Sequence, residues 1–185
     1  MITVGIDEVG RGCWAGPVVA GAVILTKPIN GLKDSKLLSK LQRQRLDVEI
    51  RLNTEAIGIG WVEPAVIDDI GINAAVKLAM QLALDQIADT YDEVIIDGHI
   101  NYLADRPKTR ELIKADSLVP AVSAASIVAK VARDNFMADI DSQYPAYGFA
   151  HHVGYGTATH LQALKLNGVI NLHRRSYKPI KALLQ

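Results

Sequence analysis

Short apolar runs separated by loops rich in glycine and proline dominate the first part of the chain. Residues 2–6 form an apolar run, and residues 17–25 form a second run of small and β-branched side chains. In residues 57–61, large apolar side chains alternate with glycines. These patterns predict three β-strands, of which the first two form a hairpin. The alternating glycines leave one face of the third strand bare, so we expect another element to pack closely there.

Helical patterns lie between and after these strands. Ser39, with Gln42 three residues later, has the signature of a capping box. It predicts a helix through Leu52, with Leu41, Val48 and Leu52 facing inward. Further helices are predicted over residues 73–88, 121–140, 158–167 and 180–184.

Two more short apolar runs end on an aspartate. Residues 93–97 end at Asp97, and residues 112–116 end at Asp116 after a loop that contains proline. Strands that alternate with helices and carry polar groups at their carboxyl ends are typical of an α/β sheet with a site at that edge. The chain has no internal repeat, low-complexity tract or linker. We therefore expect a single domain over residues 1–185, with a short basic helical tail at the C-terminus.

The composition is typical of a folded protein without disulfides. Apolar residues make up 49% of the chain, charged residues 22%, and Cys13 is the only cysteine. One cysteine cannot form an internal disulfide and fits a reducing compartment. We interpret Cys13 as a small buried side chain beside a glycine turn. No apolar run has the length of a membrane span, and no signal peptide is recognisable. We therefore expect a cytoplasmic protein without membrane contact.

The charges are distributed unevenly although the net charge is zero. Residues 1–105 contain 9 lysines and arginines against 15 acidic residues, whereas residues 106–185 contain 11 against 5. An acidic part that binds metal, next to a basic part, would suit an enzyme that acts on a polyanion. Chance segregation of charges remains the alternative.

Four carboxylates at the ends of predicted strands indicate a metal site. They are Asp7, Glu8, Asp97 and Asp116. Any one of them could be a turn or cap residue, but a set of four would repel one another without a cation. Oxygen ligands favour Mg²⁺ or Mn²⁺, and two such ions commonly hydrolyse phosphodiesters. Because neighbouring strand residues point to opposite faces, Asp7 and Glu8 can share a metal only if the strand stops or bulges there.

A second polar pattern lies on the helix predicted after Asp116. At about 100° per residue, Ser126, Lys130 and Arg133 fall in one narrow stripe. We interpret this hydroxyl, amine and guanidinium as contacts to phosphate, with an ordinary solvated helix face as the alternative. The sequence Asp34-Ser35-Lys36 is a weaker candidate, since it could be a simple turn.

Together these motifs resemble ribonuclease HII, the bacterial type 2 ribonuclease H, over nearly the whole chain. The motifs are GIDEVGRG at 5–12, DSK at 34–36, IDG at 96–98, the run 114–134, YGF at 147–149, GYGT at 154–157 and HR at 173–174. The resemblance implies a ribonuclease H-like α/β fold with a mixed five-stranded sheet flanked by helices. It also implies a metal-dependent endonuclease that cleaves the RNA strand of RNA–DNA hybrids and the 5′ side of single ribonucleotides embedded in duplex DNA. The products would carry a 3′-hydroxyl and a 5′-phosphate, and the enzyme would serve DNA replication and ribonucleotide excision repair.

The resemblance also implies which residues form the site. The catalytic residues, which would hold Mg²⁺ or Mn²⁺ with Asp7 as the bridge, are Asp7, Glu8, Asp97 and Asp116. The substrate contacts would be Gly10, Arg11, Gly12, Ser35, Lys36, Ser126, Lys130, Arg133 and Tyr155. Among these, the backbone of the Gly-Arg-Gly turn and the Tyr155 hydroxyl would read the ribose 2′-hydroxyl.

Two positions depart from the family pattern. Ala115 replaces a glycine that many members carry, and we expect this change to be harmless. Val153 replaces a frequent lysine and so removes a possible phosphate contact.

Other functions stay open at this point. The chain could be another two-metal nuclease of the same fold, such as an integrase or resolvase, or a ribonuclease HIII, which typically carries an extra N-terminal domain. It could also be a module that binds hybrids without cutting them. We expect a monomer whose partners are RNA–DNA hybrids and DNA duplexes that contain ribonucleotides, while binding of a replication clamp by the basic tail stays open.

Overall fold

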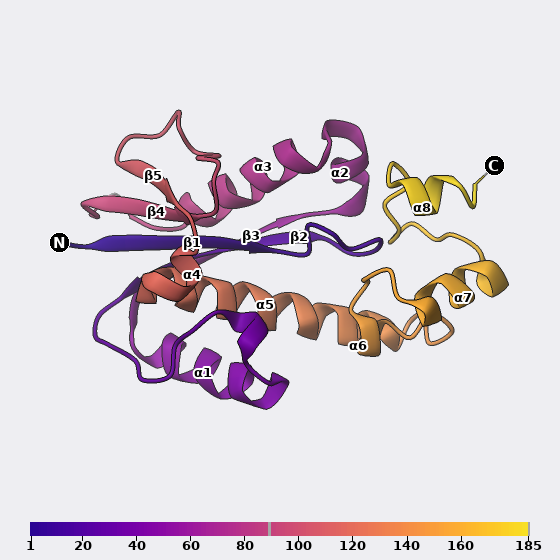
Figure 1. The fold of residues 1–185 in the computed structure, drawn as a ribbon, viewed down its shortest axis with the longest axis horizontal. Helices are drawn as coiled ribbons and strands as arrows, with labels where there is room; N and C mark the ends of the chain where they lie inside the picture. Colours follow the sequence, from indigo (N-terminus) through magenta and orange to yellow (C-terminus); the bar gives the residue numbers. More distant parts are fainter. Residues whose placement is uncertain (89, 185) are drawn as a thin grey trace.

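One mixed β-sheet forms the centre of the protein. The computed structural model describes residues 1–88 and 90–184, and the sheet has the strand order β3-β2-β1-β4-β5 (Figure 1). The strands are β1 (Thr3–Val9), β2 (Val18–Leu25), β3 (Thr54–Val62), β4 (Glu93–Asp97) and β5 (Thr109–Leu112). β1 is central: it pairs antiparallel with β2, as in the predicted hairpin, and parallel with β4. The mixed five-stranded sheet predicted from the sequence is confirmed.

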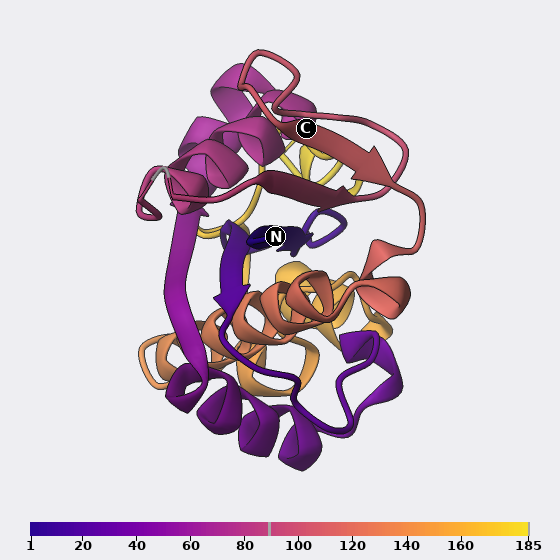
Figure 2. The same cartoon turned by 90° about the vertical axis from the view of Figure 1, so that its left-hand side faces the viewer.

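Helices cover both faces of this sheet. The longer helices are α1 (Lys40–Leu52), α3 (Ile72–Leu84), α5 (Pro120–Asp141) and α7 (Ala158–Asn167). The short elements are η1 (Ser35–Leu37), α2 (Pro64–Ile70), α4 (Ala115–Leu118), α6 (Phe149–His152) and α8 (Lys178–Lys181). Figures 1 and 2 show α2 and α3 on one face, and α5 on the other with α1 outside it. Among the described residues, no helix combines the length and apolar character needed to cross a membrane.

The bare face of β3 receives helix α3, as predicted. A Cβ atom added to Gly58 would overlap the carbonyl oxygen of Ala83, and one added to Gly60 would overlap that of Ala79. The backbone of α3 therefore lies directly against the strand, which only glycine allows at these two positions.

The predicted inward face of α1 is wrong, although its start is right. Ser39 and Gln42 form both bonds of the capping box. Leu41, Val48 and Leu52, however, are 77%, 59% and 78% exposed. The buried apolar side chains are Leu46 and Ile50, which pack in a cluster with residues of α5. The helix carries two apolar stripes, and periodicity alone cannot choose the one that meets α5.

The predicted strand at 112–116 is also wrong. β5 ends at Leu112, Lys114 has a φ of 59°, and Asp116 lies in the first turn of α4. A left-handed residue interrupts the strand geometry, so the apolar pair before it does not continue the sheet. Two helix ends shift as well: α3 ends at Leu84 instead of 88, and α8 covers 178–181 instead of 180–184.

Three histidines are buried together in the C-terminal part. The rings of His152 and His160 stack with their centroids 4.3 Å apart, and the Nε2 atoms of His160 and His173 lie 3.1 Å apart. Burial lowers the pKa of His160 to about 4 and that of His173 to about 4. The folded protein therefore keeps both rings neutral at pH values where an unfolded chain would protonate them.

We expect this cluster to make the protein sensitive to acid. The ordinary pKa of histidine is 6.5, so between pH 6.5 and pH 4 the unfolded state binds protons that the folded state does not, and stability falls as pH falls. Between pH 7 and pH 5 the loss should be roughly 2–4 kcal/mol for the pair. Carboxylates with a raised pKa have the opposite effect on the pH dependence of stability. The effect of the histidines must therefore be measured as a difference between a histidine variant and the parent protein. Thermal melts at pH 7 and pH 5 should show a smaller drop for His160→Gln than for the parent protein; equal drops would contradict the expectation.

Candidate active site

Three aspartates meet at one edge of the sheet. Asp7, Asp97 and Asp116 each offer a carboxylate oxygen, and these oxygens all lie within 4.8 Å of one another. Asp97 is the last residue of β4, as predicted, whereas Asp7 lies two residues before the end of β1 and Asp116 lies on α4. The parallel pairing of β1 with β4 places the first two side by side. The predicted carboxylates thus converge, although only one of the three ends a strand.

Glu8 stands beside this triad and is not part of it. β1 runs through Glu8 to Val9 with a regular register against β2, so the strand shows neither the stop nor the bulge that was the condition for Asp7 and Glu8 to share one metal. The Glu8 backbone N–H donates to Asp7 Oδ1 at 2.8 Å, and Glu8 Oε1 lies 3.7 Å from Arg11 Nη1. Burial raises the pKa of Glu8, and the guanidinium of Arg11 opposes that shift.

The triad is electrostatically incomplete without a cation. Burial raises the pKa of Asp7 well above its ordinary value, and the charges of Glu8 and Asp97 raise it further. Burial and Asp97 also raise the pKa of Asp116. Lys36 Nζ lies 4.0 Å from Asp116 Oδ2, but its side chain is 77% exposed and neutralises the group only weakly. Converging carboxylate oxygens of this kind fit a hard divalent cation.

A cavity of about 230 Å³ opens beside the carboxylates. Asp7, Glu8 and Asp97 line it, and so do nearly all the predicted substrate contacts. These are Gly10, Arg11, Gly12, Ser35, Lys36, Ser126, Lys130 and Tyr155. Residues that are far apart in the sequence therefore line one cavity together with the carboxylates of Asp7, Glu8 and Asp97.

Tyr155 and Lys130 form one side of this cavity. Lys130 Nζ donates to Asp134 Oδ1 at 2.7 Å and lies 5.7 Å from the centroid of the Tyr155 ring. Burial raises the pKa of Tyr155 to about 12. Its hydroxyl therefore stays protonated at neutral pH and can donate a hydrogen bond to a ligand.

The predicted phosphate stripe on α5 is wrong for Arg133. This side chain is fully buried, and its guanidinium donates to the carbonyl oxygens of Ala15, Pro17 and Val153 at 3.0, 2.9 and 2.8 Å. Almost the whole first half of α5 is buried, so the stripe is not a solvated face and a phosphate cannot reach Arg133.

Ser126 and Ser35 form a buried pair at the base of the cavity. Their hydroxyl oxygens lie 2.9 Å apart, and a hydrogen bond from Ser126 favours the charged form of Asp7. We therefore revise the predicted role of Ser126 from phosphate contact to support of the Asp7 carboxylate, with Ser35 as its hydrogen-bond partner.

Cys13 is fully buried, as expected.

Sequence reasoning missed the part of the site that Arg174 forms. This arginine is fully buried, and it donates to the backbone carbonyls of Arg11 and Gly16, both in the loop after β1. The sequence offered only the dipeptide His-Arg in a basic segment. Such a segment usually indicates solvent-exposed charge, and nothing in its spacing pointed to the N-terminal loop.

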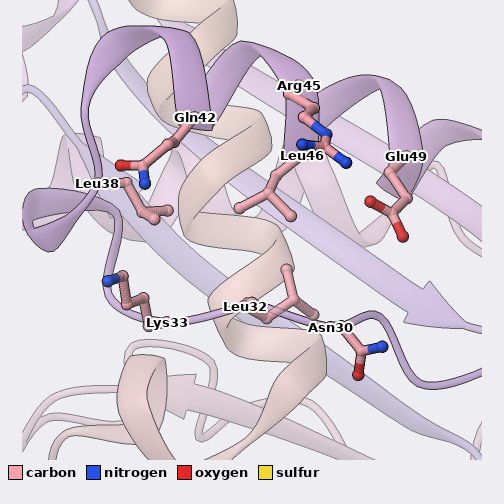
Figure 3. A pocket seen from close by; sticks show the side chains of 9 residues that line it. Asn30, Leu32, Lys33, Leu38, Gln42, Arg45, Leu46 and Glu49 are labelled. Atoms are coloured by element: carbon pink, nitrogen blue, oxygen red, sulfur yellow. The ribbon is translucent and has the colours of Figure 1, made fainter.

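A larger cavity lies elsewhere. It measures about 350 Å³ and is lined by residues 30–33, Leu38 and one side of α1 (Figure 3). None of the predicted catalytic or substrate residues lines it. We therefore place the site at the smaller, acidic cavity.

Comparison with known proteins agrees with this geometry. The family model described as Ribonuclease HII matches residues 4–180. A ribonuclease HII of Bacillus cereus (strain B4264) is 47% identical over 183 residues, which cover 98% of this chain and 70% of the relative.

Solved structures show the same fold. The ribonuclease H2 of Pyrococcus horikoshii OT3 superposes with a TM-score of 0.82 at 25% identity, covering 99% of this chain and 97% of that one. A structure of Bst-RNase HIII in complex with Mn²⁺ has a TM-score of 0.75 at 21% identity, covering 100% and 69%. The match of the family model over almost the entire chain, together with the identity to the Bacillus protein, shows that the chain belongs to the ribonuclease HII family of metal-dependent endoribonucleases, which act on RNA–DNA hybrids.

Proposed function

We propose that the protein hydrolyses the phosphodiester on the 5′ side of a ribonucleotide, both in RNA–DNA hybrids and at single ribonucleotides embedded in DNA. The observation that carries this proposal is the position of the acidic triad beside a cavity walled by the Gly10–Gly12 backbone. We assign catalysis and metal binding to Asp7, Glu8, Asp97 and Asp116. The products are a 3′-hydroxyl and a 5′-phosphate.

The four carboxylates have different proposed roles because they occupy different positions in the site. Asp7 is buried and lines the cavity, and its carboxylate oxygen lies within 4.8 Å of those of both Asp97 and Asp116, which suits a bridging ligand. Two divalent cations, Mg²⁺ or Mn²⁺, would supply the positive charge that in-line attack of water on a phosphodiester requires. Glu8 lines the same cavity and adds a carboxylate at its rim. The Mn²⁺ in the Bst-RNase HIII structure agrees with this choice of ions.

The backbone of the turn after β1 suits recognition of a 2′-hydroxyl. Within the described part of the chain, the N–H groups of Arg11 and Gly12 donate to no protein acceptor. A Cβ atom on Gly12 would meet nothing within 4 Å, so the protein itself does not require glycine there. A ligand that approaches the backbone closely would require glycine at this position. Tyr155, which lines the same cavity, adds a protonated hydroxyl.

Further parts of the proposal concern the setting of this activity. We propose that residues 1–185 act as one catalytic domain, as a monomer in the cytoplasm, on RNA–DNA hybrids and DNA duplexes that contain ribonucleotides. Such an activity would serve DNA replication and ribonucleotide excision repair. Lys36 and Lys130, whose amines border the cavity, are the proposed contacts to phosphate.

The decisive experiment is digestion of a DNA duplex that holds one ribonucleotide, with the products mapped to the nucleotide. A matched all-DNA duplex and an RNA–DNA hybrid serve as controls. We expect a single cut on the 5′ side of the ribonucleotide and none in the all-DNA duplex. Cutting of the all-DNA duplex would instead indicate a two-metal nuclease that does not require ribose. Tight binding without any product would indicate a binding module.

Tyr155→Phe tests the recognition of ribose. Leaving one hydrogen-bonding group of the substrate unpaired costs about 1–3 kcal/mol, so kcat/KM on the single-ribonucleotide duplex should fall roughly tenfold or more. Folding should be unaffected, because the ring remains. Tyr144→Phe, at an exposed position away from the cavity, is the matched control. Unchanged activity of Tyr155→Phe would mean that its ring only packs against the loop.

A further inference from the structure

We infer that Arg174 and Tyr177 are positioning residues that orient one peptide bond of the Gly10–Cys13 turn, so that the Gly12 N–H faces the substrate. The inference rests on the proposed recognition of the 2′-hydroxyl and deepens it. Both side chains lie about 160 positions away from the turn in the sequence, and neither lines the active-site cavity.

The contacts converge on a single carbonyl oxygen. Arg174 Nη1 donates to the Arg11 carbonyl at 3.0 Å, and the Tyr177 hydroxyl donates to the same oxygen at 2.6 Å. Arg174 also donates to the Tyr177 hydroxyl at 2.9 Å, and its Nε and Nη2 donate to the Gly16 carbonyl at 3.0 and 2.9 Å. We call Arg174 and Tyr177 the carbonyl clamp.

The contacts of Arg174 are made to backbone carbonyls and to Tyr177. Arg174 is fully buried, yet no ion pair in the described chain includes it. A buried guanidinium without a carboxylate is costly unless its donors are used. Four of its five N–H groups donate to two backbone carbonyls and the Tyr177 hydroxyl, and Arg174 Cζ lies 5.2 Å from the Tyr177 ring centroid. The positive charge therefore serves to hold backbone.

The held carbonyl belongs to the central peptide of a β-turn. Cys13 N donates to the Gly10 carbonyl at 3.3 Å, so residues 10–13 form the turn and the peptide between Arg11 and Gly12 is its centre. In a trans peptide the C=O and N–H groups point in opposite directions, and the chain has no cis peptide bond among its described residues. Because the clamp holds the carbonyl on the buried side, the Gly12 N–H points away from it, on the side of the exposed turn surface.

The sequence of the turn does not by itself fix the orientation of the peptide between Arg11 and Gly12. Gly12 is not among the glycines with positive φ, so the turn is not type II. A flip of the central peptide would produce type II, and glycine at the third position is the residue that type II turns prefer. No atom outside the neighbouring residues lies within 4 Å of a Cβ built on Gly12, so that side of the turn faces open space. Without the clamp, the Arg11 carbonyl could turn toward the acidic cavity and place an acceptor where the 2′-hydroxyl needs a donor.

Arg133 plays a different part in the same loop. It donates to the carbonyls of Ala15, Pro17 and Val153 and to none in residues 10–13. It therefore fixes the loop as a whole, whereas the orientation of the central peptide depends on the clamp.

Tyr177→Phe tests the inference with the smallest change. It removes one donor to the Arg11 carbonyl and keeps the ring that Arg174 packs against. Replacement of Arg174 itself would leave several buried carbonyls unpaired and could unfold the protein. The matched control is Tyr147→Phe, because the Tyr147 hydroxyl donates to the carbonyls of Asn167 and Gly168 in the same C-terminal part, away from the turn.

The measurement is selectivity of binding in Ca²⁺, a metal expected to support binding without turnover. Dissociation constants are compared for a DNA duplex with one ribonucleotide and an all-DNA duplex of the same sequence. We expect Tyr177→Phe to reduce the preference for the ribonucleotide about three- to tenfold, the effect of about one hydrogen bond, while affinity for the all-DNA duplex stays the same. The Gly12 amide resonance should shift in a ¹⁵N–¹H spectrum of the free variant. Tyr147→Phe should change neither.

Three results would overturn the inference. A full preference in Tyr177→Phe, with the parent protein also selective, would reject the clamp and leave the proposed function intact. An equal loss of preference for the ribonucleotide in Tyr177→Phe and Tyr147→Phe would mean that Tyr177 has only a structural role. Equal binding of the two duplexes by the parent protein would reject recognition of the 2′-hydroxyl, and this inference with it.

Discussion

Asp7→Asn should abolish cleavage and, at the same time, raise the stability of the metal-free protein. Asp7 is buried between other carboxylates that raise its pKa, so replacing it with a neutral isostere removes repulsion and a desolvated charge. The same change removes the proposed central metal ligand. We expect kcat to fall by about a thousandfold or more, equal to ~4 kcal/mol of transition-state stabilisation.

Two measurements separate these effects. Thermal melts in EDTA should show a higher melting temperature for Asp7→Asn than for the parent protein. Addition of Mg²⁺ should raise the melting temperature of the parent and leave that of the variant nearly unchanged. Asp105→Asn, an exposed aspartate paired with Lys77 outside the site, is the control and should retain full activity. Turnover near the parent level by Asp7→Asn would remove Asp7 from the metal site.

Arg133→Met should destabilise the fold strongly. Methionine keeps the length and most of the volume of the side chain, but it leaves the carbonyls of Ala15, Pro17 and Val153 without their donor. Each buried unpaired group costs about 1–3 kcal/mol, so the free energy of unfolding should fall by roughly 3–5 kcal/mol. Gly10 packs directly on this guanidinium, so the loop after β1 should loosen as well.

Urea denaturation of Arg133→Met, beside Asn135→Ala at an exposed position of the same helix, measures the effect. The control should change by less than about 0.5 kcal/mol. A stable Arg133→Met protein whose substrate affinity has lost part of its salt dependence would instead restore the phosphate role that the sequence suggested.

Local patterns were sufficient to predict most of the sheet. The runs that became β1 to β4 are apolar, β-branched or alternating with glycine, and each signal is contained within a few residues. The capping box at Ser39 and the glycine face of β3 are equally local. The inward face of α1 was not predictable in this way, because α5 decides which of two apolar stripes becomes buried.

The carboxylates were predictable as a set, and their supports were not. An aspartate in an apolar run is conspicuous, since burial of its charge is costly. An arginine in a helix or in a basic segment is not, because it usually faces solvent. Arg133 donates to the Pro17 carbonyl and Arg174 to the Arg11 carbonyl, each more than 100 residues away in the sequence. No local sequence pattern indicates such a distant partner.

The bonds between the two ends of the chain also impose an order on the synthesis of this protein. The sheet strands and the carboxylates are complete once α4 has been made, but Ala15 forms a β-bridge with His173, and Arg174 N donates to the Trp14 carbonyl at 2.8 Å. Contacts of such long sequence separation close late in folding. A chain still emerging from the ribosome therefore holds its acidic residues before the recognition turn has its final shape. On the proposed function, it would become able to distinguish ribose from deoxyribose only when nearly all of its sequence is free to fold.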